Sequence, residues 1–259
     1  MEPGKYYEVS VSAINAMGEG AAKHVSFLSL PDSPSGFRNV TVREDGIDLK
    51  WNSVITATYY ALERDKVSVY NDVYTEFTDT ELQAGTEYNY RISAENETGF
   101  GDYAHLGVMT LPERVTTLSS VTKDVYSVGV AWQDVQGAEG YILNVNDEPK
   151  VQIPRGIHSY TFEGLPAGRS ANIKIRAYNR SGTGLDASIN ALTLPNSALQ
   201  LAAVDVREHD ATLIWAPVDG VTQYKVTING QNYDSTEPRV VVSGLTGGKN
   251  YTFQVSSGN

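Results

Sequence analysis

The chain has 259 residues, of which 41% are hydrophobic and 20% charged, with 23 glycines and no cysteine. This is the composition of a folded globular protein rather than a disordered one, and without disulfides each domain must rest on its hydrophobic core. The net charge of −11 argues against nucleic-acid binding, and no apolar run approaches the ~18 residues that would predict membrane insertion.

Several landmarks recur along the chain at intervals of 81 and 83 residues. They are the tryptophans Trp51, Trp132 and Trp215, the tyrosines nine residues later (Tyr60, Tyr141 and Tyr224), and the Leu-Pro steps at Leu30-Pro31, Leu111-Pro112 and Leu194-Pro195. Self-similarity at a fixed interval indicates an array of one module. The Leu-Pro steps divide the chain into segments 1–31, 32–112, 113–195 and 196–259.

Segment 32–112 predicts seven short strands. Apolar residues alternate with polar ones, and turn residues such as Asp45-Gly46 separate the runs. The predicted strands are 37–42, 47–51, 59–64, 67–70, 75–79, 88–94 and a last one that ends at Leu111-Pro112. Seven strands in fewer than 100 residues indicate a two-sheet antiparallel sandwich.

The other segments follow the same plan to different extents. Segment 113–195 repeats all of it, and segment 196–259 repeats it without the seventh strand. Segment 1–31 matches only the last two strands of a module. Either these ends belong to a longer array, or the N-terminal seventh strand completes the last module of another molecule by head-to-tail strand exchange.

Two further motifs strengthen the repeat. Leu-x-x-Gly-x-x-Tyr stands at Leu82…Gly85…Tyr88 and Leu245…Gly248…Tyr251, and Asn-x-x-Gly-x-Gly begins at Asn15, Asn96 and Asn179. With the tryptophans and tyrosines in fixed order, the chain resembles tandem fibronectin type III modules over essentially its whole length. The resemblance implies an all-β fold of tandem seven-stranded immunoglobulin-like β-sandwiches, in which the motif tyrosine closes a corner by a hydroxyl hydrogen bond.

One segment departs from this pattern. In segment 113–195 the corner position holds Ala171 instead of tyrosine. We therefore expect this to be the least stable of the complete modules, and we expect Ala171→Tyr to raise its melting temperature, because a buried hydroxyl hydrogen bond contributes about 1 kcal/mol.

The sequence offers no catalytic, cofactor-binding or metal-binding motif. The four histidines lack the spacing of a local metal clamp, Gly-x-Ser-x-Gly is absent, and no glycine-rich loop leads into a helix. The 14 acidic and 6 basic residues of segment 32–112 indicate a solubilising surface. We therefore expect neither enzymatic activity nor a cofactor.

Binding is expected at the loops between the sixth and seventh strands, because sandwich modules carry recognition on loops held by a rigid scaffold. The candidate binding residues are Glu97, Thr98, Phe100, Asp102, Arg180 and Thr183. Phe100 equally fits a contact with the neighbouring module. Four Asn-x-Ser/Thr sequons, at Asn39, Asn96, Asn179 and Asn250, are glycan acceptors if the chain passes through a eukaryotic secretory pathway.

These features predict a non-catalytic spacer and adhesion segment that lies extracellularly or at the cell surface. The expected partners are a protein or a surface polysaccharide, together with neighbouring modules of the same array. Two alternatives remain: a receptor-contact module of a phage tail or fibre, placed in the virion tail, and an accessory module of a secreted polysaccharide-degrading enzyme.

Overall fold

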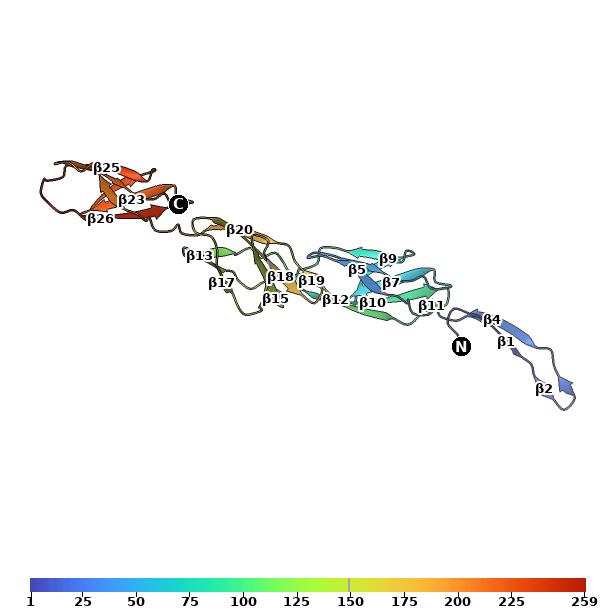
Figure 1. The fold of residues 1–259 in the computed structure, drawn as a ribbon. Helices are drawn as coiled ribbons and strands as arrows, with labels where there is room; N and C mark the ends of the chain where they lie inside the picture. The colour runs from blue at the N-terminus through green and yellow to red at the C-terminus, as the bar shows by residue number, and fades with distance from the viewer. Residues whose placement is uncertain (149) are drawn as a thin grey trace. The chain divides into compact units, whose positions relative to one another are not determined.

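The computed structural model describes residues 1–148 and 150–259, which divide into two compact units. The first unit contains residues 1–114, 135–140 and 177–185, and the second contains residues 115–134, 141–176 and 186–259. In this part of the chain every regular element is a β-strand, and no helix is present that could cross a membrane (Figure 1). The predicted all-β class is confirmed.

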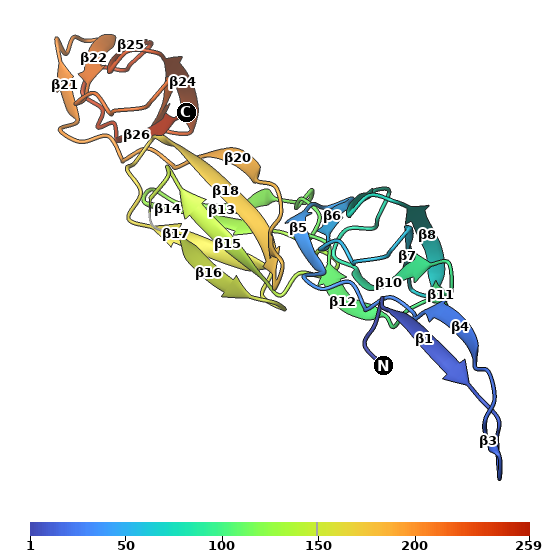
Figure 2. The ribbon, with the colours of Figure 1, turned by 90° about the vertical axis from the view of Figure 1, so that its right-hand side faces the viewer.

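The first unit begins with a hairpin of β1 (Tyr6–Val11) and β4 (Lys23–Leu28), which pair antiparallel. At its tip the short strands β2 (Ile14–Asn15) and β3 (Gly18–Glu19) pair with each other (Figure 2). These are the two strands that the sequence predicts for segment 1–31.

Two antiparallel sheets follow in segment 32–112. One sheet has the order β5-β6-β9, and the other has the order β11-β10-β7-β8; β12 also pairs with β10, on the side away from β7. The strands are β5 (Arg38–Val42), β6 (Ile47–Lys50), β7 (Tyr59–Arg64), β8 (Val67–Asp72), β9 (Glu76–Asp79), β10 (Glu87–Asn96), β11 (Gly99–Phe100) and β12 (Ala104–Met109). All seven predicted strands are present; β11 is an addition within the loop that follows β10.

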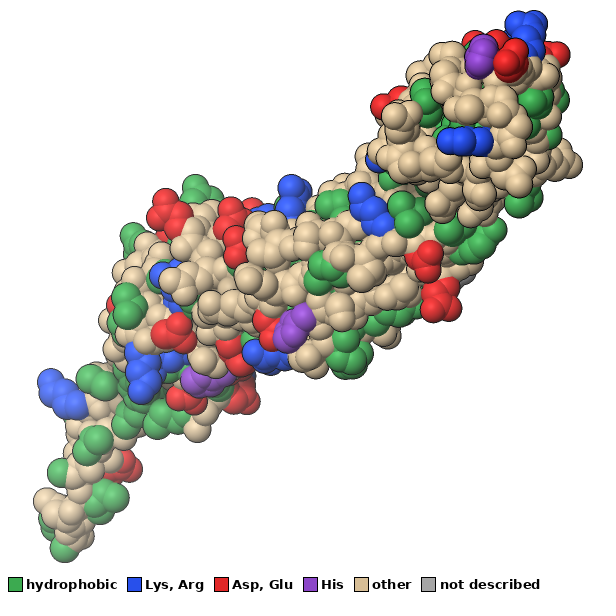
Figure 3. Space-filling view, turned by 90° about the vertical axis from the view of Figure 1, so that its left-hand side faces the viewer, with side chains coloured by type: hydrophobic (Ala, Val, Ile, Leu, Met, Phe, Trp, Pro, Cys, Tyr) green, Lys and Arg blue, Asp and Glu red, His purple; other side chains and the backbone are tan. Residues whose placement is uncertain are grey.

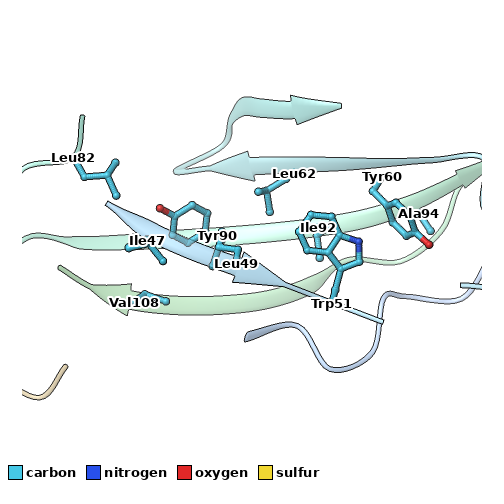
Figure 4. Packing of buried hydrophobic residues seen from close by; sticks show 10 residues of the cluster. All are labelled: Ile47, Leu49, Trp51, Tyr60, Leu62, Leu82, Tyr90, Ile92, Ala94 and Val108. Atoms are coloured by element: carbon cyan, nitrogen blue, oxygen red, sulfur yellow. The ribbon is translucent and has the colours of Figure 1, made fainter. Parts of the chain in front are cut away.

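The core of this sandwich lies between the two sheets (Figure 4). Along β6, Ile47 and Leu49 are buried while Lys50 is exposed, which is the period of two that a strand with one buried face requires. Trp51 is 2% exposed and meets the ring of Tyr60 edge-on, with 5.7 Å between ring centroids. The same pair recurs in the second unit at Trp132–Tyr141 (5.4 Å) and Trp215–Tyr224 (5.2 Å). The 81- and 83-residue intervals therefore mark equivalent core positions.

The second unit is built from the same sheets. One pair has the orders β13-β14-β17 and β16-β15-β18 with β20 beside β18; the next has β21-β22-β25 and β24-β23-β26. The strands are β13 (Ser119–Lys123), β14 (Ser127–Ala131), β15 (Gly140–Val145), β16 (Val151–Pro154), β17 (Ser159–Glu163), β18 (Ser170–Asn179), β20 (Ala187–Leu192), β21 (Ala202–Val204), β22 (Asp210–Ile214), β23 (Gln223–Ile228), β24 (Gln231–Ser235), β25 (Arg239–Ser243) and β26 (Phe253–Gly258). The last residues of β18 pair with β19 (Gly182–Thr183), and these residues belong to the first unit.

Charged side chains of both signs are interspersed over the surface seen in Figure 3. Several acidic residues of segment 32–112 are paired: Arg43 with Asp48 (2.7 Å), Arg64 with Asp79 (2.8 Å) and Arg91 with Glu63 (2.6 Å). The hydrogen bonds from Arg43 lower the pKa of Asp48 to about 2. These pairs join equal numbers of acidic and basic residues, so they leave the acidic surplus of this segment unchanged.

Candidate functional site at the joints between repeats

We call the contact between the end of one repeat and the next repeat a joint. Each joint includes a corner loop, the turn that precedes the motif tyrosine position, and where that position is a tyrosine its hydroxyl holds this loop by a hydrogen bond. Tyr88 accepts a hydrogen bond at its hydroxyl from the backbone N–H of Gln83 (2.8 Å), five residues upstream. Tyr251 does the same with Thr246 (2.9 Å), and that bond lowers the pKa of Tyr251. In the hairpin, the Tyr7 hydroxyl accepts from Glu2 (2.5 Å). The corner implied by the motif is therefore formed at all three tyrosines.

The replacement of the corner tyrosine by Ala171 is accompanied by a second change in the same loop. The residue five positions upstream is Pro166, which has no backbone N–H to donate to a hydroxyl. Ala171 is 2% exposed and pairs with Ala191 on β20. The expectation for Ala171→Tyr therefore changes, since a tyrosine at this position would find no corner donor unless Pro166 is replaced as well.

The hydroxyl of a serine or threonine just before each Leu-Pro step also forms hydrogen bonds to the backbone of the corner loop. The Thr110 hydroxyl accepts from the backbone N–H of Thr86 (3.0 Å) and donates to the carbonyl of Gln83 (2.7 Å). Thr193 makes the equivalent bonds to Arg169 (3.0 Å) and Pro166 (2.7 Å). Ser29 makes them to Lys5 (2.9 Å) and Glu2 (2.8 Å). This hydroxyl was missed in the sequence, although it recurs at the same intervals of 81 and 83 residues.

The backbone carbonyl of that serine or threonine accepts a bond from the next repeat. In the first unit, the side-chain Nδ2 of Asn96 donates to the carbonyl oxygen of Ser29 (2.8 Å), and Asn96 is 4% exposed. Its Oδ1 accepts from the backbone N–H of Thr98 (2.9 Å), whose hydroxyl donates to the carbonyl of Leu28 (2.7 Å). The first residue of Asn-x-x-Gly-x-Gly thus shapes its own loop with one atom and holds the preceding strand end with another.

The next joint in this unit repeats the arrangement. Asn179 is 5% exposed, its Nδ2 donates to the carbonyl of Thr110 (2.8 Å), and its Oδ1 accepts from the backbone N–H of Ser181 (2.9 Å). Arg180 forms an ion pair with Glu87 (2.7 Å) at the edge of the contact. Because Thr110 is fully buried, the bond from Asn179 satisfies a carbonyl that solvent does not reach.

The motif glycines make room for the Leu-Pro step. A Cβ added at Gly101 would lie 2.1 Å from the carbonyl oxygen of Pro31, and one added at Gly184 would lie 2.3 Å from that of Pro112. A Cβ added at Gly182 would lie 3.1 Å from the Leu111 side chain. Backbone therefore approaches backbone so closely that only glycine fits.

The corner glycines form the other half of each joint. Gly85 has φ +60°, and an added Cβ would lie 2.1 Å from the carbonyl oxygen of Gln136, in the loop 135–140. In the second unit, Gly168 approaches Asp219 in the same way (2.6 Å), and a Cβ added at Gly220 would lie 1.9 Å from the Gly168 carbonyl oxygen. That unit also contains a third asparagine bond, from Nδ2 of Asn259 to the carbonyl of Thr193 (2.9 Å).

The predicted binding residues fall into two groups around these joints. Glu97 accepts a hydrogen bond from the Tyr6 hydroxyl (3.1 Å), and that bond raises the pKa of Tyr6. Thr98 and Arg180 contact the preceding repeat as described above, and exposed Thr183 lies beside Gly184 in a shallow hollow that Glu44 and Leu111 also line. Phe100, which is 48% exposed, and Asp102 face solvent.

The sequons divide in the same way. Asn96 and Asn179 are buried with their amide nitrogens engaged in the joints, whereas Asn39 and Asn250 are exposed. Among residues 1–148 and 150–259, no group of three or more His, Asp or Glu side chains is placed to hold a metal ion. The chemistry that the joints offer is hydrogen bonding and close backbone contact.

Comparison with curated proteins gives partial relatives of low identity. Neogenin from Homo sapiens is 26% identical over 209 residues, which cover 68% of this chain and 14% of that protein. Tenascin-R from Mus musculus is 26% identical over 209 residues (74% and 15%), and Netrin receptor DCC from Homo sapiens is 27% identical over 207 residues (68% and 14%). The chain thus spans about one seventh of the length of these relatives. No protein-family model matches the chain.

Among solved structures, the FN1-FN3 domains of chicken CNTN1 align with a TM-score of 0.35 at 17% identity, over 88% of this chain and 94% of that one. A two-domain fibronectin type III segment of chicken tenascin aligns with a TM-score of 0.42 at 18% identity, over 62% and 100%. The repeated motifs and the two-sheet strand pairings of the present chain resemble those of tandem fibronectin type III modules.

Proposed function

We propose that the chain is a non-catalytic spacer and adhesion segment of an extracellular or cell-surface protein. In this proposal segments 1–31, 32–112, 113–195 and 196–259 are successive modules or parts of modules. The observation that carries it is the recurrence of one joint, in which an asparagine amide, a Ser/Thr carbonyl and closely packed glycines connect consecutive repeats. Tying repeats at a fixed contact is what a spacer requires.

The relatives support the adhesion half of the proposal in a general way. One of them is named a netrin receptor, which favours a protein partner over a surface polysaccharide. None of the three reported relatives carries the name of a phage protein or of a polysaccharide-degrading enzyme. The virion-tail and accessory-module alternatives therefore have no support from them.

Adhesion is tested by capture of surface proteins from the source organism and its host with the intact chain as bait. The informative variant is Phe100→Ser with Asp102→Ser, because these two candidates face solvent and their replacement leaves the joint hydrogen bonds in place. Val67→Ser, at a 64% exposed position in the same segment, is the matched control. A specific protein captured by the parent and the control but lost by the variant supports an adhesion site at this loop. Capture that both variants retain places adhesion elsewhere, and no capture leaves the spacer role alone.

Head-to-tail strand exchange is the competing account of the terminal segments. It predicts that the mass in solution rises with protein concentration, because β4 of one copy would pair with β26 of another. Sedimentation equilibrium distinguishes the two: a monomer mass of about 28 kDa at all concentrations excludes exchange.

A further inference from the structure

The loop at the tip of the N-terminal hairpin has the same shape as the two joint loops. The Oδ1 of Asn15 accepts from the backbone N–H of Met17 (2.8 Å), matching the 2.9 Å bonds inside the loops that begin at Asn96 and Asn179. The middle glycine has φ +133° at Gly18, against +136° at Gly99 and +146° at Gly182. The loop 15–20 is therefore preformed for the contact that the other two make.

The loops that begin at Asn96 and Asn179 hold segments of the same kind. Each holds the end of a β-strand with the sequence Ser/Thr-Leu-Pro, at Ser29-Leu30-Pro31 or Thr110-Leu111-Pro112. The Ser/Thr carbonyl accepts from the asparagine Nδ2, the leucine side chain lies against the middle glycine, and the proline carbonyl lies over the last glycine. Two independent copies thus define the same three-point recognition.

In the third copy, the loop 15–20, the residues equivalent to these contact positions are exposed. A Cβ added at Gly18 would meet no atom within 4 Å, and Met17 and Ile14 are 95% and 75% exposed. Hydrophobic side chains are visible on this end of the hairpin in Figure 3. A preformed loop loses little conformational freedom on binding, which favours association with a segment of the right sequence.

We propose that the loop 15–20 is a clamp for a β-strand end with the sequence Ser/Thr-Leu-Pro, supplied by another module of this kind. This inference deepens the proposed spacer function by naming the sequence that each joint recognises. The selectivity follows from the contacts: the asparagine donor needs a free carbonyl, and the glycines admit only backbone and a leucine methyl at close range.

The test is an NMR titration of the full ¹⁵N-labelled chain with a capped peptide that has the sequence of residues 106–113, Leu-Gly-Val-Met-Thr-Leu-Pro-Glu. We expect saturable shift changes in the amides of residues 14–20, including the Asn15 side-chain amide. A peptide with glycine in place of the leucine of Thr-Leu-Pro should bind at least several-fold more weakly, because it lacks the side chain that lies against the middle glycine.

The matched protein variant is Gly20→Ala. At this position an added Cβ would meet only the Ala13 carbonyl oxygen at 3.4 Å, so the loop itself tolerates alanine. At the equivalent Gly101 and Gly184 the same atom would collide with the proline carbonyl, so Gly20→Ala should abolish the shift changes. Shifts that persist in Gly20→Ala, or no shifts with several millimolar peptide, would overturn the proposal. Neither result would affect the capture experiment that tests adhesion.

Discussion

Gly85→Ala should open the joint between segments 32–112 and 113–195. Gly85 has φ +60°, where an alanine side chain costs about 1 kcal/mol, and its new Cβ would lie 2.1 Å from the Gln136 carbonyl oxygen. Both atoms belong to backbone or sit directly on it, so no rotamer change relieves the collision. The joint must separate by more than 1 Å, roughly the difference between 2.1 Å and ordinary van der Waals contact.

The size of the effect follows from what that separation breaks. The Asn179–Thr110 hydrogen bond would lengthen beyond bonding distance, and a buried carbonyl would lose its donor. Such a loss costs about 1–3 kcal/mol. Since each 1.4 kcal/mol is tenfold, joint opening should become about 30-fold more frequent.

Gly248→Ala is the matched control for this change. Gly248 is also a corner glycine, with φ +74°, but an added Cβ there meets nothing within 4 Å. Hydrogen exchange of the Leu185 backbone amide, which donates to Glu44 across the joint at 3.2 Å, reports opening. We expect faster exchange in Gly85→Ala and unchanged exchange in Gly248→Ala. Equal rates in the two variants would refute the close backbone contact as the cause.

Three further changes test separate parts of the structure. Asn179→Asp keeps the acceptor that shapes the loop but places an oxygen against the Thr110 carbonyl, so it should destabilise the joint by about 2 kcal/mol. The control Asn15→Asp should leave the melting temperature within about 1 °C of the parent value. Similar shifts in the melting temperature of both variants would contradict the role of Asn179 in the joint. In a double-mutant cycle, the change in the free energy of unfolding for Pro166→Gln with Ala171→Tyr should be about 1 kcal/mol more favourable than the sum of the two single changes. Only the pair restores both the backbone donor and the hydroxyl acceptor of the corner. Additive changes would show that no corner hydrogen bond forms. Asp48 has a pKa lowered to about 2, so its pairing with Arg43 stabilises the fold above about pH 4, and this stabilisation is lost as the pH falls toward 2. In urea titrations, Asp48→Asn should reduce the change in the free energy of unfolding over this pH range by about 1 kcal/mol. The same pH profile in the variant and the parent would contradict this contribution.

Much of the fold followed from the sequence because the signals are local. Alternation along residues 47–51 and 88–94 places one face of each strand in the core, and the Trp–Tyr spacing recurs because the same ring contact recurs. Each of these features depends on a few neighbouring residues. The strand pairings could then be inferred from the resemblance to a known sandwich.

The joints could not be assembled in the same way. The Leu-Pro steps, the Asn-x-x-Gly-x-Gly loops and the corner glycines were each visible in the sequence, but the contacts join residues 66–69 positions apart. Nothing in the spacing states that Asn179 reaches Thr110. The recurrence of Ser29, Thr110 and Thr193 before Leu-Pro was a usable signal, since a hydroxyl residue kept in register at a repeat boundary indicates a required hydrogen bond.

Asn96 and Asn179 hold the carbonyl at the end of the preceding repeat, whereas Asn15 is exposed. The most direct measurement is the exchange of the three Asn side-chain amides in the unmodified chain, together with cross-relaxation between the Asn179 Nδ2 protons and Leu111. We expect slow exchange at Asn96 and Asn179, a cross-peak at Leu111, and fast exchange at Asn15. Equally fast exchange at all three, without that cross-peak, would show that Asn96 and Asn179 do not hold these carbonyls.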